Sequence, residues 1–304
     1  MIKTIAFIGL GTMGQGMAGQ LLKRGFAVRG LDADPHKTAA LAADGATACS
    51  SVAQACEGAD AVITMLPRDE HVRHVLTGDG GVMDNAQPGT LVLEMSTIFP
   101  ASSLQIGAAL RKAGLRMMDA PVGRTPADAR VGTLFVLAGG ERGDFEQAKA
   151  VFDAMGDKVL YLGPAGSGIR MKVINNYMTM VSMVLTAETL ALARKAGIEL
   201  SAAAEVLQNT VAGRGQINVN YPRKVLAGDI SPDFPIELGR KDLSLALKLG
   251  DELGVPLFLG ASAHQLFGAA CEQGRAGQDC TAMLLALEQL AGMSPSVTTP
   301  GGQP

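Results

Sequence analysis

A glycine-rich turn near the start of the chain is the feature that most restricts its fold. Residues 9–14 read Gly-Leu-Gly-Thr-Met-Gly, a G-x-G-x-x-G pattern that follows the apolar run 2–8 and precedes a helix-like stretch. Asp32 stands 18 residues beyond Gly14, at the end of the next strand-like run. A strand, this turn, a helix and then an acid form the context that dinucleotide binding requires. The pattern therefore predicts an α/β dinucleotide-binding domain at the N-terminus.

The turn residues have distinct physical roles in this interpretation. Gly9 permits the tight turn, Gly11 lets the backbone approach a pyrophosphate, and Gly14 lets the helix pack closely on the strand. Backbone N–H groups at the start of the helix attract phosphate oxygens, and Thr12 and Met13 lie in the same turn. We therefore expect all five residues to bind the cofactor.

Asp32 indicates which cofactor is bound. Its carboxylate can accept hydrogen bonds from the adenosine ribose hydroxyls, and no arginine follows it immediately. Its negative charge repels a 2′-phosphate, so NAD(H) is favoured over NADP(H). The alternative is that the glycines form an ordinary turn beside an exposed acid.

Strand-like and helix-like segments alternate through the first half of the chain. After the strand at 26–31, the pattern predicts helices near 35–44, 70–76, 100–113 and 145–155, and strands at 61–65, 90–95, 116–119, 133–138 and 158–162. Such alternation predicts a mostly parallel sheet with helices on both faces. We expect this Rossmann-type α/β domain to cover residues 1–164.

The pattern becomes helical after Gly168. Apolar residues recur at helical spacing from Ile169 to Ala196, which is longer than an ordinary globular helix. Helical patterns continue to about Leu290, with turns expected at 212–215, 228–235 and 254–256. We therefore expect an all-α domain over residues 165–292, built on this long helix, and a flexible tail over 293–304, which is rich in Pro, Gly, Ser and Thr.

The composition argues against several classes of protein. The 26 Lys and Arg residues balance 29 Asp and Glu to a net charge of −3, without a long basic run, so no nucleic-acid partner is expected. Four cysteines without a C-x-x-C pair favour a reduced, cytoplasmic compartment over a disulfide framework. Pro256 and His264 interrupt the uncharged stretch 253–271, so no membrane span is expected. His71 and His74 lack an evident third ligand, so no metal site is expected.

A polar stripe marks the predicted long helix. Lys172, Asn175, Asn176 and Thr179 are spaced i, i+3, i+4 and i+7 among apolar neighbours, and therefore share one helix face. A partly buried lysine on such a face, with its pKa lowered by burial, could exchange a proton with a substrate oxygen. By spacing alone, a solvated face or a lysine paired with an acid is an equally good interpretation.

Several further motifs resemble those of the 3-hydroxyisobutyrate dehydrogenase, or β-hydroxyacid dehydrogenase, family. They are ITMLP at 63–67, EMSTI at 94–98, DAPV at 119–122, GTL at 132–134, GSGIRMKVINN at 166–176 and KDLSLAL at 241–247. With the glycine-rich turn they occur in order over nearly the whole chain. The resemblance implies a Rossmann domain followed by an all-α domain, and reversible NAD(P)H-dependent reduction of small acid-bearing aldehydes to hydroxy acids. It also implies a homodimer or homotetramer, because the all-α half of family members packs against a second subunit.

The resemblance also implies roles for single residues. Lys172 matches the catalytic lysine, and Asn176 matches the asparagine one turn further along the helix. Ser96 and Thr97 match residues that line the nicotinamide and substrate region, and Lys241 matches a residue near the cofactor in the segment that closes the cleft. A loop along the cofactor is matched by Met65, Leu66 and Pro67.

One segment departs from the family pattern. DAPV is usually followed by Ser-Gly-Gly, whose serine and backbone hold the substrate carboxylate, but this chain has Gly123-Arg124-Thr125. A guanidinium offers a rigid fork of donors that suits an oxyanion. Alternatively, Arg124 forms only a structural salt bridge, for example with Asp128.

Within the family, this segment resembles the branch that acts on a sulfonate aldehyde. GIRMKVINNYM, TVAGRGQ at 210–216 and PRKVLAGDISPDF at 222–234 share that resemblance, which implies reduction of 3-sulfolactaldehyde to 2,3-dihydroxypropane-1-sulfonate with NADH in sulfosugar breakdown. The three sulfonate oxygens need more donors than a carboxylate does. We expect these donors to come from Arg124, Asn175, Asn176 and Thr179, and also from Gly123, Thr125 and Ser96. The alternatives are a carboxylate substrate, of the 3-hydroxyisobutyrate, tartronate semialdehyde or succinic semialdehyde type, and a non-catalytic nucleotide-binding scaffold.

Overall fold

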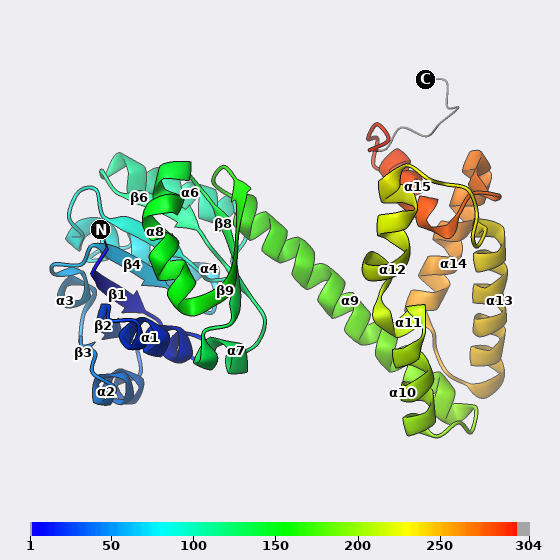
Figure 1. Ribbon diagram of the computed structural model, residues 1–304, viewed down its shortest axis with the longest axis horizontal. Coiled ribbons are helices and arrows are strands. Elements are labelled where there is room, and N and C mark those ends of the chain that lie inside the picture. The colour runs from blue at the N-terminus through cyan, green and yellow to red at the C-terminus, as the bar shows by residue number, and fades with distance from the viewer. Residues whose placement is uncertain (1, 297–304) are drawn as a thin grey trace. The chain divides into compact units, whose positions relative to one another are not determined.

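The computed structural model describes residues 2–296. The chain divides into two compact units, the first ending at Met178 and the second beginning at Thr179. Each unit is a separate body with its own arrangement of elements (Figure 1).

The described part of the first unit is built on a nine-stranded sheet with the order β3-β2-β1-β4-β5-β6-β8-β7, in which β9 also pairs with β8 (Figure 1). The strands are β1 (Thr4–Ile8), β2 (Ala27–Leu31), β3 (Thr47–Ala48), β4 (Ala61–Thr64), β5 (Leu91–Glu94), β6 (Arg116–Asp119), β7 (Val122–Gly123), β8 (Leu134–Gly139) and β9 (Gly156–Gly163). All pairs from β3 to β6 are parallel, whereas β8 runs antiparallel to β6 and β7. The prediction of a mostly parallel sheet is confirmed.

Helices cover both faces of this sheet. They are α1 (Gly14–Lys23), α2 (Pro35–Ala43), α3 (Val52–Cys56), α4 (Asp69–Thr77), α5 (Val82–Asn85), α6 (Pro100–Lys112), α7 (Pro126–Val131) and α8 (Arg142–Met155). Successive strand side chains point to opposite faces. Phe7 therefore packs with Phe152 of α8 in one core, while its neighbour Ile8 packs with Leu110 of α6 in the other. The predicted Rossmann-type α/β architecture is confirmed.

The sequence pattern missed the two-residue strands β3 and β7 and the short helices α3, α5 and α7. Two residues cannot show the alternation of a strand, and four to six residues are too few to show the 3.6-residue period of a helix. For α7 a local signal was present, because Thr125 and Asp128 have capping-box spacing and form that box in the structure.

The long helix α9 (Ser167–Lys195) starts deep in the first unit, and the two units divide within it. Asp119, the last residue of β6, accepts hydrogen bonds from the backbone N–H groups of Gly166 (2.6 Å) and Ile169 (2.8 Å). A Cβ on Gly168 would overlap the carbonyl oxygen of Leu137, so only glycine allows this approach. The carboxylate and the close approach together tie the start of α9 to the sheet.

The second unit is helical, as predicted. Beyond the rest of α9 it contains α10 (Leu200–Asn209), α11 (Val211–Arg214), α12 (Gln216–Arg223), α13 (Ile236–Leu253), α14 (Phe258–Ala270) and α15 (Met283–Leu290) (Figure 1). The expected turn at 212–215 is wrong, because Val211–Arg214 forms one helical turn. The domain boundary at 164/165 stays a prediction. Within the predicted tail, Ser296 N donates to Glu288, and residues 297–304 lie outside the described residues.

A buried lysine organises the loop before α13. Lys224 is 3% exposed, and its Nζ lies 2.7 Å from Asp229 Oδ2 and 3.2 Å from Ser231 Oγ. Hydrogen bonds from Lys224 and Ser231 lower the pKa of the Asp229 carboxyl to about 2.

Across residues 2–296, no helix has the length and apolar character needed to cross a membrane.

Candidate functional site

A cavity of about 870 Å³ lies in the first unit, where β1, β2 and β4 end. Parallel sheets of this type bind ligands at the carboxyl ends of their strands. The cavity brings together the predicted cofactor residues Gly9, Gly11, Thr12, Met13, Gly14, Asp32, Met65, Leu66 and Pro67. Residues from three separate parts of the sequence therefore meet at one edge of the sheet.

The glycine-rich turn has the shape that a pyrophosphate needs. Gly9 has φ +101°, and a Cβ there would overlap the carbonyl oxygen of Met65, while a Cβ on Gly14 would overlap the carbonyl oxygen of Gly9. Gly11 faces open space, with nothing within 4 Å of the position of a Cβ. The first turn of α1 carries no acidic residue and no side-chain cap, so its N–H groups can bind an anion. The residues present therefore fit the phosphates of a dinucleotide.

Asp32 is held in place at the end of β2. Its Oδ2 accepts a hydrogen bond from Leu10 N (2.7 Å), and its Oδ1 accepts one from Asp34 N (2.9 Å). Lys37 Nζ lies 3.3 Å from Oδ1. These contacts keep one carboxylate at the cavity wall, where the sequence predicts contact with the ribose.

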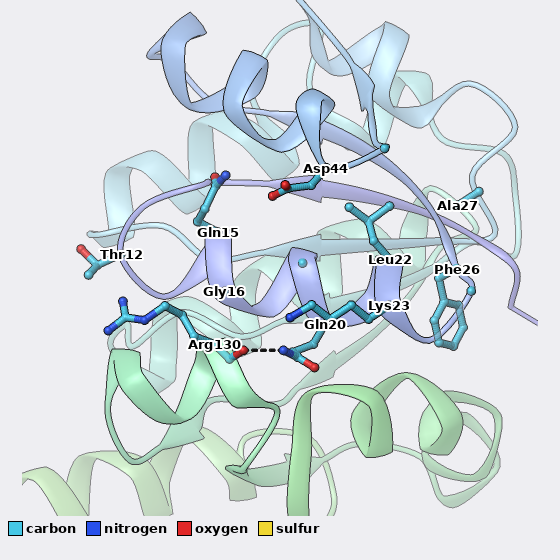
Figure 2. Close-up of a pocket in the computed structure, with 13 residues that line it drawn as sticks. Thr12, Gln15, Gly16, Gln20, Leu22, Lys23, Phe26, Ala27, Asp44 and Arg130 are labelled. Carbon is cyan, nitrogen blue, oxygen red and sulfur yellow. Dashed lines mark hydrogen bonds between the residues drawn. The ribbon is translucent and has the colours of Figure 1, made fainter.

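A second cavity, of about 930 Å³, follows the outer side of α1 (Figure 2). Of the predicted site residues, Thr12 alone lines this second cavity, so the reaction is not placed there. Gln20 Nε2 donates a hydrogen bond to the carbonyl oxygen of Arg130, the bond drawn as a dashed line in Figure 2. A Cβ on Gly16 would lie 3.0 Å from the backbone of Ala129. Helix α1 thus holds α7, and with it Thr125 at the end of the 123–125 segment.

The predicted catalytic helix face is partly buried. Lys172 and Asn176 are half-buried on the part of α9 that belongs to the first unit, whereas Asn175 is exposed. Burial lowers the pKa of Lys172 from its usual 10.5. No acid of residues 2–296 forms a salt bridge with Lys172, which argues against the interpretation as a structural ion pair. Asn175 Nδ2 donates to Asn176 Oδ1 at 3.3 Å.

Two predicted residues belong to the second unit. Thr179 is its first residue, and Lys241 on α13 forms an ion pair with Asp242 at 2.9 Å. Their contacts with substrate and cofactor stay predictions.

Ser96 lies behind the cavity wall. It is fully buried, and its Oγ accepts a hydrogen bond from Leu66 N at 2.9 Å. The hydroxyl therefore supports the cofactor-lining segment 65–67, a role that the sequence did not reveal. Thr97, the next residue, is exposed. The predicted contacts of Ser96 with substrate and of Thr97 with cofactor are not tested by this arrangement.

Arg124 has an unusual backbone conformation. Its φ is +77°, and it is the one non-glycine residue with positive φ in the described chain. Its Nη1 lies 2.7 Å from Asp157 Oδ1 and also donates to the Thr133 carbonyl oxygen. The suggested pair with Asp128 is wrong, because the Asp128 carboxylate is bound by Thr125 in the capping box. Gly123 belongs to β7, so the segment leaves the sheet edge directly at Arg124.

Two acids that the sequence analysis did not select prove to support the site. Asp119 anchors the start of α9, and Glu94 accepts a hydrogen bond from Ser96 N at 2.8 Å. Their signal was their position at strand ends, in DAPV and EMSTI. His71 and His74 line the cofactor cavity, and residues 2–296 contain no group of three side chains suited to a metal.

Comparison with known proteins identifies the family. One family model, the NAD binding domain of 6-phosphogluconate dehydrogenase, matches residues 4–163. A second, the NAD-binding domain of NADP-dependent 3-hydroxyisobutyrate dehydrogenase, matches residues 166–287. The chain belongs to the 3-hydroxyisobutyrate dehydrogenase family. The resemblance found in the motifs is therefore confirmed.

Relatives within the 3-hydroxyisobutyrate dehydrogenase family differ in substrate. The chain is 41% identical to 3-sulfolactaldehyde reductase of Escherichia coli strain K12, over 96% of this chain and 98% of that protein. It is 39% identical to the NAD-dependent L-serine dehydrogenase of Pseudomonas aeruginosa, over 91% and 95% of the two chains. The structure of Mycobacterium tuberculosis 3-hydroxyisobutyrate dehydrogenase with L-serine matches with 31% identity and a TM-score of 0.66, over 94% and 99%. As a family member, the protein is an NAD(H)-dependent oxidoreductase that acts on the CH–OH group of a small hydroxy acid.

We expect NADH to bind more tightly than NADPH. A 2′-phosphate about 4 Å from the Asp32 carboxylate would meet roughly 1–4 kcal/mol of repulsion, which weakens binding at least about fivefold. Dissociation constants for both cofactors, measured by fluorescence titration, test this.

Asp32→Ala should reduce the preference, and Asp34→Asn is the matched control. Asp34 caps α2 and does not line the cavity, and asparagine caps a helix equally well. Equal affinity of the native protein for both cofactors would contradict the assignment.

Proposed function

We propose that this protein reduces 3-sulfolactaldehyde to 2,3-dihydroxypropane-1-sulfonate with NADH, reversibly, in the breakdown of a sulfosugar. The observation that carries the proposal is the guanidinium of Arg124, in a segment that reads Gly123-Arg124-Thr125 where the family usually has Ser-Gly-Gly. The 41% identity to a 3-sulfolactaldehyde reductase supports it.

The backbone of Arg124 argues for a functional side chain. A non-glycine residue with left-handed φ costs about 1–2 kcal/mol, which a glycine would avoid. Such strain persists where the side chain supplies something else, and binding sites are where it concentrates. The salt bridge with Asp157 offsets little of this backbone cost. Both side chains are well exposed, at 37% and 50%, and exposed pairs contribute about 0–1 kcal/mol to stability.

The guanidinium retains donors for a substrate. Within residues 2–296 its hydrogen bonds use Nη1, whereas Nε and Nη2 have no protein acceptor there. These two groups form one side of the planar fork, which can donate two parallel hydrogen bonds to an oxyanion. We infer that this fork binds two sulfonate oxygens and that the weak contact with Asp157 can be exchanged.

Other predicted residues complete the substrate site in this proposal. The third sulfonate oxygen and the adjacent hydroxyl need further donors, which we assign to the backbone at Gly123 and to the side chain of Asn175. A carboxylate has one oxygen fewer and needs a smaller set. The same site therefore favours a sulfonate over a carboxylate of similar length.

Lys172 is the proposed proton donor. When bound, NADH supplies the hydride that reduces the aldehyde carbon. The Lys172 ammonium donates a proton to the carbonyl oxygen, and in the reverse reaction the neutral amine accepts the proton of the alcohol. Burial favours this exchange because it lowers the pKa of Lys172 toward the working range. Asn176, one turn further along α9, orients the same oxygen.

The second candidate is a carboxylate hydroxy acid. The relative named as an L-serine dehydrogenase, at 39% identity, supports this alternative. Turnover of 3-sulfolactaldehyde against tartronate semialdehyde and succinic semialdehyde at equal concentration distinguishes the two. A higher kcat/KM for a carboxylate aldehyde would contradict the sulfonate assignment.

We also propose that the chain forms a homodimer or homotetramer. Within the second unit large apolar side chains are exposed, among them Phe258 (74%), Met183 (63%), Val206 (62%) and Leu245 (58%). Exposed apolar surface of this extent is typical of subunit interfaces. Light scattering coupled to size exclusion should report the mass of two or four chains, and the mass of one chain would contradict the proposal.

Lys172→Ala should reduce turnover by at least about 10²- to 10⁴-fold, the usual contribution of general acid catalysis. NADH affinity should change little, because the cavity residues lie elsewhere on the first unit. In the native protein, the rate of aldehyde reduction should fall as the pH rises through the lowered pKa of Lys172, since reduction needs the ammonium form. Alcohol oxidation should show the opposite dependence. Near-normal turnover of a folded variant would place the proton donor elsewhere.

Arg124→Gly should raise KM for 3-sulfolactaldehyde by about 10- to 150-fold, the value of a charge-assisted contact of roughly 1.5–3 kcal/mol. Stability should change by less than about 1 kcal/mol, because relief of the backbone strain offsets the greater freedom of glycine in the unfolded chain. Arg124→Lys should rescue only partly, because an ammonium lacks the fork.

The matched control for Arg124 is its partner. Asp157→Asn removes the same salt bridge but keeps the guanidinium, so KM should stay the same or fall. If Arg124→Gly and Asp157→Asn impair catalysis alike, or if charged and uncharged aldehydes suffer equally, Arg124 has only a structural role.

A further inference from the structure

Three polar side chains form a buried row at the end of the central strands. Thr64, Glu94 and Asp119 are the last residues of β4, β5 and β6, and the strand register pairs Thr64 with Glu94 and Glu94 with Asp119. Paired residues of parallel strands point to the same face of a sheet. All three are buried, with exposures of 0%, 0% and 2%.

Glu94 connects this row to the cofactor cavity through two hydrogen bonds. Its Oε1 accepts a bond from Ser96 N at 2.8 Å, and Ser96 Oγ accepts one from Leu66 N at 2.9 Å. Leu66 lines the cavity, between Met65 and Pro67. The position of this part of the cavity wall therefore depends on a buried carboxyl two contacts away.

The other carboxyl oxygen of Glu94 has no hydrogen-bond donor among residues 2–296 that would stabilise a negative charge. Glu94 Oε2 is buried and, like the neighbouring Thr64 Oγ1, has no hydrogen-bond partner in residues 2–296. The charged groups that face Glu94 are two acids, Asp119 on β6 and Asp69 at the start of α4. Burial raises the pKa of Glu94 to about 8, and these two carboxyls add to the rise while hydrogen bonds from Ser96 oppose it. The neutral carboxyl is thus the form that the folded protein holds at pH 7.

We propose that Glu94 is a positioning residue for the cofactor: its neutral carboxyl holds Ser96 and Leu66 in the cavity wall, and loss of its proton loosens that wall and weakens NADH binding. The inference depends on the proposed function in one respect, namely that the cofactor bound in the cavity is NADH. A charge on the buried carboxyl gains hydration only if water reaches it. The Ser96–Leu66 contact links the carboxyl to the cavity, so hydration acts on the surface that NADH contacts.

The sign of the pH dependence follows from linkage. Since the proton is held more tightly in the folded protein than in the unfolded chain, the contribution of Glu94 to stability is full below its ordinary pKa of 4.5 and is lost as the pH rises toward 8. If NADH binds only the protonated form, its apparent Kd rises above pH 8, by up to about tenfold between pH 7 and pH 9. By the same linkage, NADH binding at pH 8 to 9 takes up protons.

The test is the Kd for NADH between pH 6 and pH 9.5, measured by fluorescence titration of the full chain. The native protein should show the rise above pH 8, and Glu94→Gln, which has nearly the same shape but cannot ionise, should show a flat profile. Asp60→Asn is the control: this carboxyl likewise accepts backbone hydrogen bonds, from Lys3 N and Thr4 N at the opposite ends of the strands, and its loss should leave the native profile unchanged. A flat native profile, or the native rise retained in Glu94→Gln, overturns the proposal.

Ser96→Ala distinguishes positioning from a purely structural role. It breaks the contact with Leu66 and leaves Glu94 buried, so the pH dependence of NADH binding should be lost. The pH dependence of thermal unfolding should remain and move to higher pH, because the variant also lacks the hydroxyl hydrogen bond that lowers the pKa of Glu94. If the pH dependences of thermal unfolding and of NADH binding are both lost, or if both remain, the proposed connection between Glu94 and the cavity wall is contradicted.

A measurement on the native protein covers the case in which Glu94→Gln does not fold. Calorimetric titration with NADH in buffers of different ionisation enthalpy should show uptake of up to about one proton at pH 8.5. The same uptake in Lys172→Ala assigns it to a group other than the proposed proton donor. No uptake in the native protein, or its disappearance in Lys172→Ala, refutes the inference. All readouts are of binding, so they stand whether or not 3-sulfolactaldehyde is the substrate.

Discussion

The hydrogen bonds from the start of α9 to Asp119 are the interaction on which the arrangement of the first unit's candidate site depends. One buried carboxyl accepts the N–H groups of Gly166 and Ile169, and a negative group at a helix N-terminus is favoured by the helix dipole. Burial raises the pKa of Asp119, and the backbone hydrogen bonds oppose that rise. The bonds fix the first turn of α9 to the end of β6, and Lys172 follows about one turn further along the helix.

The carboxyl edge of the sheet explains why so many functional residues meet. Strands β1, β2 and β4 end at the cofactor cavity, β5 ends at Glu94 and Ser96, and β6 ends at Asp119. Each strand end supplies either a residue that lines the cavity or one that supports such a residue. Because parallel strands all end at the same edge, one sheet aligns the glycine-rich turn, the 65–67 segment and the start of α9.

Two positions carry a local cost in stability. Arg124 occupies a left-handed conformation where a glycine would be relaxed, and Glu94 is an acid in a site that disfavours its charge. The fold tolerates these local costs in free energy because two apolar cores, one on each face of the sheet, stabilise the surrounding structure. Both positions lie at the edge where ligands bind, which is where local departures from ideal structure concentrate.

The sequence by itself determined the architecture of both units, the cofactor turn and the family. These follow from local signals: periodicity specifies helices and strands, and the glycines at 9, 11 and 14 have few other uses in that context. Only the tertiary structure decided that Arg124 pairs with Asp157 rather than Asp128, that Ser96 supports Leu66, and that Glu94 and Asp119 stand side by side. These partners are separated by about 25 to 35 residues, and a contact at that separation depends on strand order and register, which no local pattern encodes.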